Sequence, residues 1–480
     1  MQSAIKLAKV RKKRAKTRKK AATNTKEKRC DQYGPHLSDS HIVSHFVGKV
    51  KHNQSMKHSI EEVHLENGAR GLLIDAPGSA VINIKIIFRA GNKFVKKPEI
   101  YEVAHLMEHM AFGRNAEFKD EQAYEAEFTK NGAYHNAWTS DNFIAYEAEC
   151  ADFEWDRILQ LQELAIAKPR FNEEELNSEK GNVRSELTGY QNDYSRLIWP
   201  KLQQELGESV LTYAERLKTI NNIELKDVRE HHRRTHTAAN MQFIITGSLR
   251  GRKRKIISML ENWDLKPGEK MEVPISTYVG TNPVLIRRKD AANVCFGFSF
   301  IIQRPLEPKE QYAMGCLNHI LTGTMSSKIL GAARRRGIVY GIGSNADNDK
   351  WSSTWDFDGE VNSENAGELF DLIAVELVRV INGDIKEEDI QAAKTYALGR
   401  HQMLAQTADQ ISTYYMREYI TTNTYEPLSE APKMIDAIDK GTIVSLAREF
   451  MQSGISGLAA VGNMNKSVVD ELWSHVLGAI

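Results

Sequence analysis

Two histidines and a glutamate lie close together in the segment VAHLMEHMAFG, residues 103–113. Residues four apart on a helix share a face, so His105 and His109 can direct ring nitrogens at one ion. Zinc binds such nitrogens and, where it is catalytic, keeps one position open for water. Glu108 lies near the same face and can take a proton from that zinc-bound water. The order His-x-x-Glu-His inverts a common zinc motif. Without a third ligand, a solvated surface helix is the simpler interpretation.

The segment resembles the zinc site of the pitrilysin-type metallopeptidases, the family that includes insulin-degrading enzyme and the mitochondrial processing peptidase. In that family a glutamate about 76 residues beyond the motif is the third ligand, and another acid precedes it by seven residues. Glu186 follows His109 after 76 intervening residues, and Glu179 precedes Glu186 by seven. Residues seven apart on a helix share a face. The resemblance implies one Zn²⁺ per chain on His105, His109 and Glu186, with Glu108 as the catalytic base and Glu179 supporting the site.

The segment HNAWTS, residues 135–140, resembles a strand that borders the active site in this family. The resemblance implies that the strand pairs with an extended peptide through main-chain hydrogen bonds. Asn136 and Ala137 are therefore expected to contact the substrate. An ordinary hairpin strand is the alternative interpretation.

The segment LTGTMSSKILGAARRRGIVYGIG, residues 321–343, resembles a family segment from which an arginine and a tyrosine complete the site. Tyr340 matches the tyrosine, which would donate to the carbonyl oxygen as negative charge builds on it. Two ways of counting place the arginine at Ala333 or Arg334. We choose Arg334, with Arg335 as the alternative, to hold the peptide. A solvated basic helix end is the other interpretation of these arginines.

The sequence departs from the family pattern in two places. Glu102 stands three residues before His105, where the family usually has glycine. The glycine-rich loop of the non-catalytic subunit of the processing peptidase is absent, which argues against that role. A second histidine cluster, His231, His232 and His236, is interpreted as solvated and outside the metal site.

The chain contains two similar patterns of strands and helices. Val81–Ala90 and Asn293–Ile302 are both predicted to be alternating strands. Met241–Leu249 and Gly457–Asn465 are both predicted to be closing strands that end near glycine and precede an amphipathic helix. The fold class is therefore predicted as α+β, with two homologous halves. Each half is expected to be a mostly antiparallel sheet with helices on one face, and the two halves to enclose a cavity. The second half lacks a counterpart of the histidine motif.

Composition divides the chain further. Residues 1–30 hold 13 Lys or Arg and one acid, and the remainder holds 51 basic and 62 acidic residues. We predict a basic, disordered arm over residues 1–45. An N-terminal peptidase domain is predicted over residues 46–262, a linker over 263–275 and a C-terminal homologous domain over 276–480.

The sequence of the arm is compatible with more than one role. It is interpreted as a solvated tail, with binding of nucleic acid or an acidic surface through residues 1–30 as the alternative. The predicted location is cytoplasmic, or an organelle matrix if the arm is a transit peptide. No apolar run is long enough to span a membrane, so an integral membrane protein is not expected.

These features together predict a zinc-dependent endopeptidase that cleaves short or unfolded polypeptides in a closed chamber. Short two-domain members of the family often pair, so a homo- or hetero-dimer is expected. One alternative is a subunit of a processing-peptidase-like complex that needs a partner chain. The other is a non-catalytic structural member, although such members typically lose zinc ligands or the base.

Overall fold

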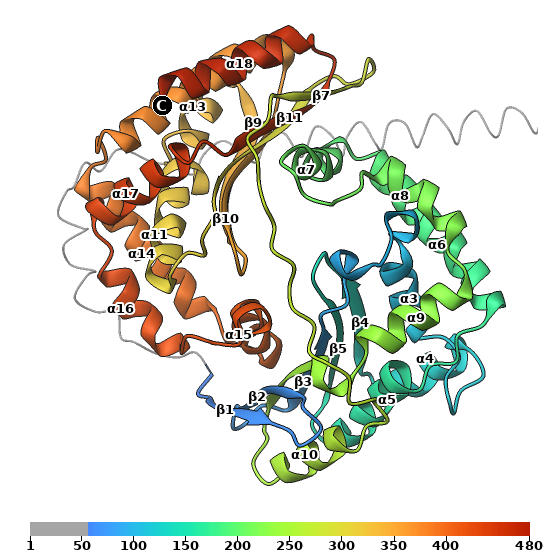
Figure 1. Cartoon of the computed structure of the whole chain (residues 1–480). Coiled ribbons are helices and arrows are strands. Elements are labelled where there is room, and N and C mark those ends of the chain that lie inside the picture. The colour runs from blue at the N-terminus through green and yellow to red at the C-terminus, as the bar shows by residue number, and fades with distance from the viewer. Residues whose placement is uncertain (1–55) are drawn as a thin grey trace, which may run out of the picture. The chain divides into compact units, whose positions relative to one another are not determined.

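The computed structural model describes residues 56–480 (Figure 1). The predicted basic arm lies outside the described residues. None of the helices between residues 56 and 480 combines the length and apolar character that crossing a membrane requires.

The first sheet has six strands in the order β1-β2-β6-β3-β5-β4. Only β2 and β6 run parallel, and the other neighbours are antiparallel. The central strands are buried on both faces, as expected for runs rich in isoleucine and phenylalanine. The strands are β1 (Ser59–His64), β2 (Arg70–Asp75), β3 (Val81–Phe88), β4 (Tyr134–Thr139), β5 (Ile144–Ala151) and β6 (Met241–Gly247).

The second sheet repeats the first with one strand fewer. Its order is β7-β11-β8-β10-β9, and again only one neighbouring pair, β7 and β11, is parallel. Taken in chain order, β7 to β11 occupy the places of β2 to β6. The predicted relation between the two halves is therefore confirmed by topology. The strands are β7 (Val284–Arg287), β8 (Val294–Ile302), β9 (Val339–Asn348), β10 (Ser353–Val361) and β11 (Ser456–Gly462).

Helices cover one face of each sheet and bury a separate apolar core there (Figure 1). The mixed sheets with their helices confirm the predicted α+β class. Helices before the second sheet are α3 (Val103–Ala111), α4 (Glu121–Thr129), α5 (Trp155–Ala167), α6 (Glu173–Gln191), α7 (Tyr194–Glu205), α8 (Tyr213–Thr219), α9 (Leu225–Thr235) and α10 (Lys253–Glu261). Those of the second half are α11 (Pro308–Asn318), α12 (Leu330–Arg335), α13 (Ala366–Ile381), α14 (Glu387–Met403), α15 (Ala408–Thr422), α16 (Ala431–Asp436), α17 (Lys440–Met451) and α18 (Lys466–Ala479).

Each sheet also receives a helix from the other half of the chain. Helix α15 packs on β3 and β6 of the first sheet, and α7 packs on β8 and β11 of the second. Two smaller apolar clusters bury these contacts. The predicted linker, residues 263–275, lies in a stretch between α10 and β7 without helix or strand. The predicted domain boundaries stay a prediction, since packing crosses between the halves in both directions.

A buried lysine accompanies the contact of α15 with the first sheet. The ammonium of Lys85 on β3 lies 2.9 Å from Asp409 on α15 and 3.0 Å from Glu147 on β5. Its side chain is almost fully buried, so a lost partner cannot be replaced by bulk water.

Asp409→Asn is therefore expected to lower the free energy of unfolding by about 1 kcal/mol, because Lys85 keeps only one charged partner. Urea unfolding followed by circular dichroism measures the change. Asp470→Asn is the matched control, since Asp470 pairs with Lys466 on the exposed side of α18 and such pairs contribute little. Equal effects of the two variants would contradict the role of Asp409 as a partner of the buried Lys85.

Candidate metal centre

Helix α3 carries the histidine motif and is buried on nearly all sides. Its apolar residues Val103, Leu106, Met107 and Met110 pack into the core of the first half. The helix also contacts α6, α9 and β4. Apolar burial therefore holds α3 in place, and the polar residues of the motif face α6 and β4.

Helix α6 brings the distant acidic residues to the motif. Asn172 caps its start by accepting a hydrogen bond from the amide of Glu175. Leu176, Val183 and Leu187 are its buried residues and face the core. The helix runs from Glu173 to Gln191, so Glu179 and Glu186 lie on the same element.

Three side chains from α3 and α6 form one compact group of possible metal ligands. His105 Nε2 lies 3.2 Å from His109 Nε2 and 3.5 Å from Glu186 Oε2, and His109 Nε2 lies 3.8 Å from the same oxygen. Ligand atoms about 2.0–2.1 Å from a tetrahedral zinc ion lie about 3.3 Å apart. The donor types and their separations therefore fit zinc. Among residues 56–480 this is the only such group of three or more.

Two further side chains contact His109 and Glu186 through the atoms that do not face the group. Glu179 Oε2 lies 3.0 Å from His109 Nδ1, so the ring donates to the carboxylate and turns Nε2 toward the group. The hydroxyl of Tyr190 donates to Glu186 Oε1 at 2.5 Å, which leaves Oε2 facing the histidines. Such outer contacts orient metal ligands.

The electrostatics of His109 follow from these neighbours. Burial by itself lowers the pKa of His109. The hydrogen bond to Glu179 and the charges of Glu108 and Glu186 outweigh burial, and the pKa is raised. In turn the hydrogen bond from His109 lowers the pKa of Glu179. The site therefore attracts positive charge.

Glu102, the departure from the family pattern, is fully buried. Its Oε2 lies 3.1 Å from His105 Nδ1, and Arg216 of α8 donates to both of its oxygens. Burial by itself raises the pKa of Glu102. The hydrogen bond from His105 and the charge of Arg216 outweigh it and lower the pKa to about 2.

The predicted base is close to the predicted substrate strand. Glu108 is buried, and its Oε2 accepts a hydrogen bond of 2.7 Å from the hydroxyl of Thr139, the last residue of β4. β4 is an edge strand that pairs only with β5. Its other edge is unpaired within the sheet. Asn136 is exposed and Ala137 is buried, so the two predicted contacts with substrate differ in accessibility.

The two predicted residues of the second half contact each other. The guanidinium of Arg334 donates to the carbonyl oxygen of Tyr340 at 2.9 Å and lies 4.9 Å from the centre of its ring. The side chain of Tyr340 is 89% exposed. Among residues 56–480, no hydrogen bond or ion pair joins either residue to His105, His109 or Glu186. Arg336 instead pairs with Glu368.

Comparison with known proteins identifies the family. The family model described as Insulinase (Peptidase family M16) matches residues 70–210. The model described as Peptidase M16 inactive domain matches residues 222–396. The chain belongs to peptidase family M16. The predicted family is thus confirmed.

Individual relatives and a solved structure are similar to this chain. A Bacillus subtilis protein named uncharacterized zinc protease YmxG is 21% identical over 417 residues, which cover 84% of this chain and 99% of that protein. Mitochondrial-processing peptidase subunit beta of Bos taurus is 26% identical over 174 residues, 35% of each chain. The crystal structure of a protease from Helicobacter pylori matches with a TM-score of 0.74 at 16% identity. It covers 84% of this chain and 100% of that one.

The second histidine cluster of the M16 chain is not solvated, and that prediction is wrong. His231 and His236 are buried, and His232 is half-buried. The ring of His231 donates to the carbonyl oxygen of Ala90, and that of His232 to Ile166. Burial lowers the pKa of His231 and of His232 to about 4. These rings are neutral packing residues, because α9 lies against α3 rather than in solvent.

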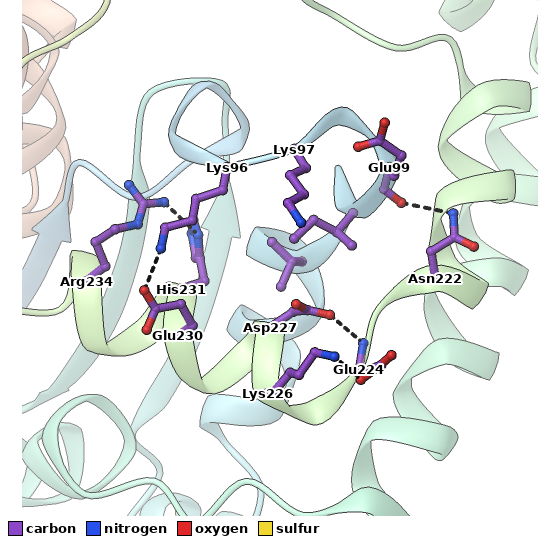
Figure 2. Close-up of a pocket in the computed structure, with 12 residues that line it drawn as sticks. Lys96, Lys97, Glu99, Asn222, Glu224, Lys226, Asp227, Glu230, His231 and Arg234 are labelled. Carbon is purple, nitrogen blue, oxygen red and sulfur yellow. Dashed lines mark hydrogen bonds and ion pairs between the residues drawn. The ribbon is translucent and has the colours of Figure 1, made fainter.

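A cavity of about 860 Å³ lies on another side of α3 (Figure 2). It opens between residues 96–100 and α9, and none of the metal group lines it. Some of its charged side chains form ion pairs with one another. Lys96 pairs with Glu230, and Lys226 pairs with Glu224. Figure 2 shows these lining side chains, which come from α9, from its N-cap and from the segment of Lys96. The cavity is therefore separate from the candidate metal centre.

The sequence motifs do not predict three residues that contact the centre. Tyr190 is one helical turn beyond Glu186, so the spacing of four could have revealed it. Thr139 lies within the quoted substrate segment, but nothing local links its hydroxyl to Glu108. Arg216 is 114 residues from Glu102, and no local pattern joins them.

Zinc binding is expected to stabilise the folded chain. A ligand that binds only the native state at 100 times its Kd adds about 2.7 kcal/mol. Zinc should therefore raise the unfolding temperature of the metal-free protein, and Glu186→Gln should remove most of that rise. Differential scanning fluorimetry with and without zinc measures both.

Glu174→Gln is the matched control, because Glu174 is an exposed residue in the first turn of the same helix α6. It should keep the full zinc-dependent rise. A rise that is equal in the Glu186 and Glu174 variants would place zinc somewhere other than this group.

Proposed function

We propose that the chain is a zinc-dependent endopeptidase that hydrolyses short or unfolded polypeptides. The observation that carries the proposal is the compact group His105, His109 and Glu186 beside the buried carboxylate of Glu108. Family membership and the likeness to a protein named a zinc protease support it.

The residues take distinct roles in this proposal. His105, His109 and Glu186 hold Zn²⁺, one per chain, which supplies a Lewis acid that polarises a peptide carbonyl and acidifies water. Glu108 accepts a proton from the attacking water and later delivers it to the leaving amine. Thr139 orients Glu108 by donating to one carboxylate oxygen, which leaves the other oxygen for the proton. Glu179 positions His109.

The unpaired edge of β4 is the proposed substrate cradle. An extended peptide added there would bond to the main chain near Asn136 and Ala137, without any fixed side-chain requirement. Because Thr139 ends this strand and contacts Glu108, a peptide on the edge would pass close to the base. Only an extended, flexible segment can add to a sheet edge, which favours short or unfolded substrates.

The second half supplies the remaining groups. We assign Tyr340 as a donor to the carbonyl oxygen of the scissile bond, and Arg334 as the residue that holds the peptide. The strong exposure of Tyr340 leaves its hydroxyl available to a bound peptide. The stacking of Arg334 on its ring supports Arg334 over Arg335 and Arg336. In this proposal the halves close around the peptide in a chamber.

A paired assembly is the second part of the proposal. The chain resembles a subunit of the mitochondrial processing peptidase over about a third of its length. We therefore propose that it acts as a homo-dimer or with a partner chain. Its own retained ligands and base argue that it is the catalytic member.

Glu108→Gln is expected to reduce peptide hydrolysis by about 10²–10⁴-fold, because the amide cannot accept the proton from water. Zinc content should stay near that of the wild type, since the amide oxygen can still accept from Thr139. A quenched fluorescent peptide gives the rate, and atomic absorption gives the metal.

Glu117→Gln is the control for that variant, since Glu117 is an exposed glutamate after the same helix. Hydrolysis by Glu108→Gln at the wild-type rate would remove Glu108 from the mechanism. A wild-type chain that neither holds zinc nor cleaves peptides, alone or with a partner, would refute the proposed function.

Tyr340→Phe is expected to lower kcat at least about tenfold with little change in KM, because the lost hydroxyl acts as charge develops on the carbonyl oxygen. Unfolding should not change, since the side chain is exposed. Steady-state kinetics on the same peptide measure both constants. Tyr396→Phe, a half-exposed tyrosine on α14, is the control. An unchanged kcat would show that Tyr340 is not a donor in the reaction.

A further inference from the structure

The carboxylate of Glu102 bonds to side chains and not to the first amides of its own helix. It occupies the N-cap position of α3, where a side chain often accepts from the first amides of the helix. Here the side chain makes no capping hydrogen bond. It is fully buried, and its three hydrogen bonds go to His105 and Arg216. A buried carboxylate is costly unless such partners satisfy it.

Arg216 is itself held firmly in place. It lies on α8, which begins with a capping box between Thr212 and Glu215. Its guanidinium lies 5.4 Å from the centre of the Tyr213 ring and 5.8 Å from that of Tyr101. Its Nε and Nη2 donate to the two oxygens of Glu102, a two-point contact that fixes the plane of the carboxylate.

This fixed carboxylate selects one form of the His105 ring. An ionised carboxylate only accepts hydrogen bonds, so the 3.1 Å contact requires the proton on Nδ1. The lone pair of a neutral ring is then on Nε2, the nitrogen that lies beside His109 and Glu186. Glu179 makes the same kind of contact with Nδ1 of His109. The two histidines thus have matching carboxylate partners at Nδ1.

We propose that Glu102, held by Arg216, is a positioning residue that orients His105 for zinc and fixes its Nδ1-protonated tautomer. The inference rests on the proposed zinc site. It adds Glu102, a residue that lies outside the His-x-x-Glu-His motif. A purely structural ion pair would need only Arg216. Oε2 of Glu102 instead bonds both the arginine and the histidine.

The test is zinc affinity, measured by competition with a chelator on folded, metal-free protein. Glu102→Gln should weaken zinc binding by about 10–100-fold, the usual effect of losing an outer partner of a ligand. Glu102→Ala, which removes the acceptor altogether, should weaken it further. Rescue of part of the affinity by Gln relative to Ala identifies the hydrogen bond as the cause.

Glu154→Gln is the matched control. Glu154 is another buried glutamate that precedes a helix of the first half and pairs with an arginine, Arg157. Its side chain is 3% exposed, so its loss disturbs folding in a comparable way, but it contacts none of the metal group. It should keep wild-type zinc affinity even where its unfolding temperature falls.

A measurement on the wild-type chain does not depend on a variant folding. With zinc bound, ¹⁵N-histidine NMR should show a protonated Nδ1 and a metal-bound Nε2 for His105, assigned by its loss in His105→Ala. A proton on Nε2, or zinc affinity of Glu102→Gln equal to that of Glu154→Gln, would overturn the inference while the zinc site stands. A wild-type chain without zinc affinity would instead refute the proposed function, and the inference with it.

Discussion

The burial of polar side chains on α3 is the constraint on which the rest of the site depends. The helix is packed on its apolar side into the core, which leaves His105 and Glu108 buried and His109 half-buried. These polar groups need hydrogen-bond partners, because an unpaired buried polar group costs from about 1 to several kcal/mol. Glu102 is satisfied by α8, Glu108 by β4 and His109 by α6. The contacts that satisfy these polar groups also orient the candidate ligands.

The two halves share a topology but differ in the segment that joins β3 to β4 and β8 to β9. The helix that follows β3 is α3, and the segment that follows β8 in the matching place holds α11, a π-helical turn over His319–Gly323 and α12. The second half uses that place to present Tyr340 at the start of the next strand, β9. The same topology therefore carries the candidate ligands in the first half and the exposed Tyr340 in the second.

Sequence alone predicted what depends on short spacing or on a family pattern. The helix of His105 and His109 follows from the motif, and two strands of each half follow from their apolar runs. Glu186 can be predicted only from the spacing of ligands in the family, because 76 residues separate it from His109. No sequence pattern predicts the contacts of Glu102 with Arg216 and of Glu108 with Thr139, since tertiary packing alone brings those elements together. The same limit applies to His231, whose polarity suggested solvent while α9 packs against α3.

Charge gives a physical reason for the site that is independent of the motif. The carboxylates of Glu102, Glu108, Glu179 and Glu186 gather around two histidines, and the arginine that bonds directly to one of them is Arg216. If all four are ionised, one guanidinium leaves a net charge of about −3 in a partly buried region, where such charges interact strongly. A divalent ion brings that to about −1. The raised pKa of His109 expresses the same field, since without a metal a proton is the cation that the group attracts. The arrangement of acids thus favours a cation at the point where the imidazole nitrogens converge.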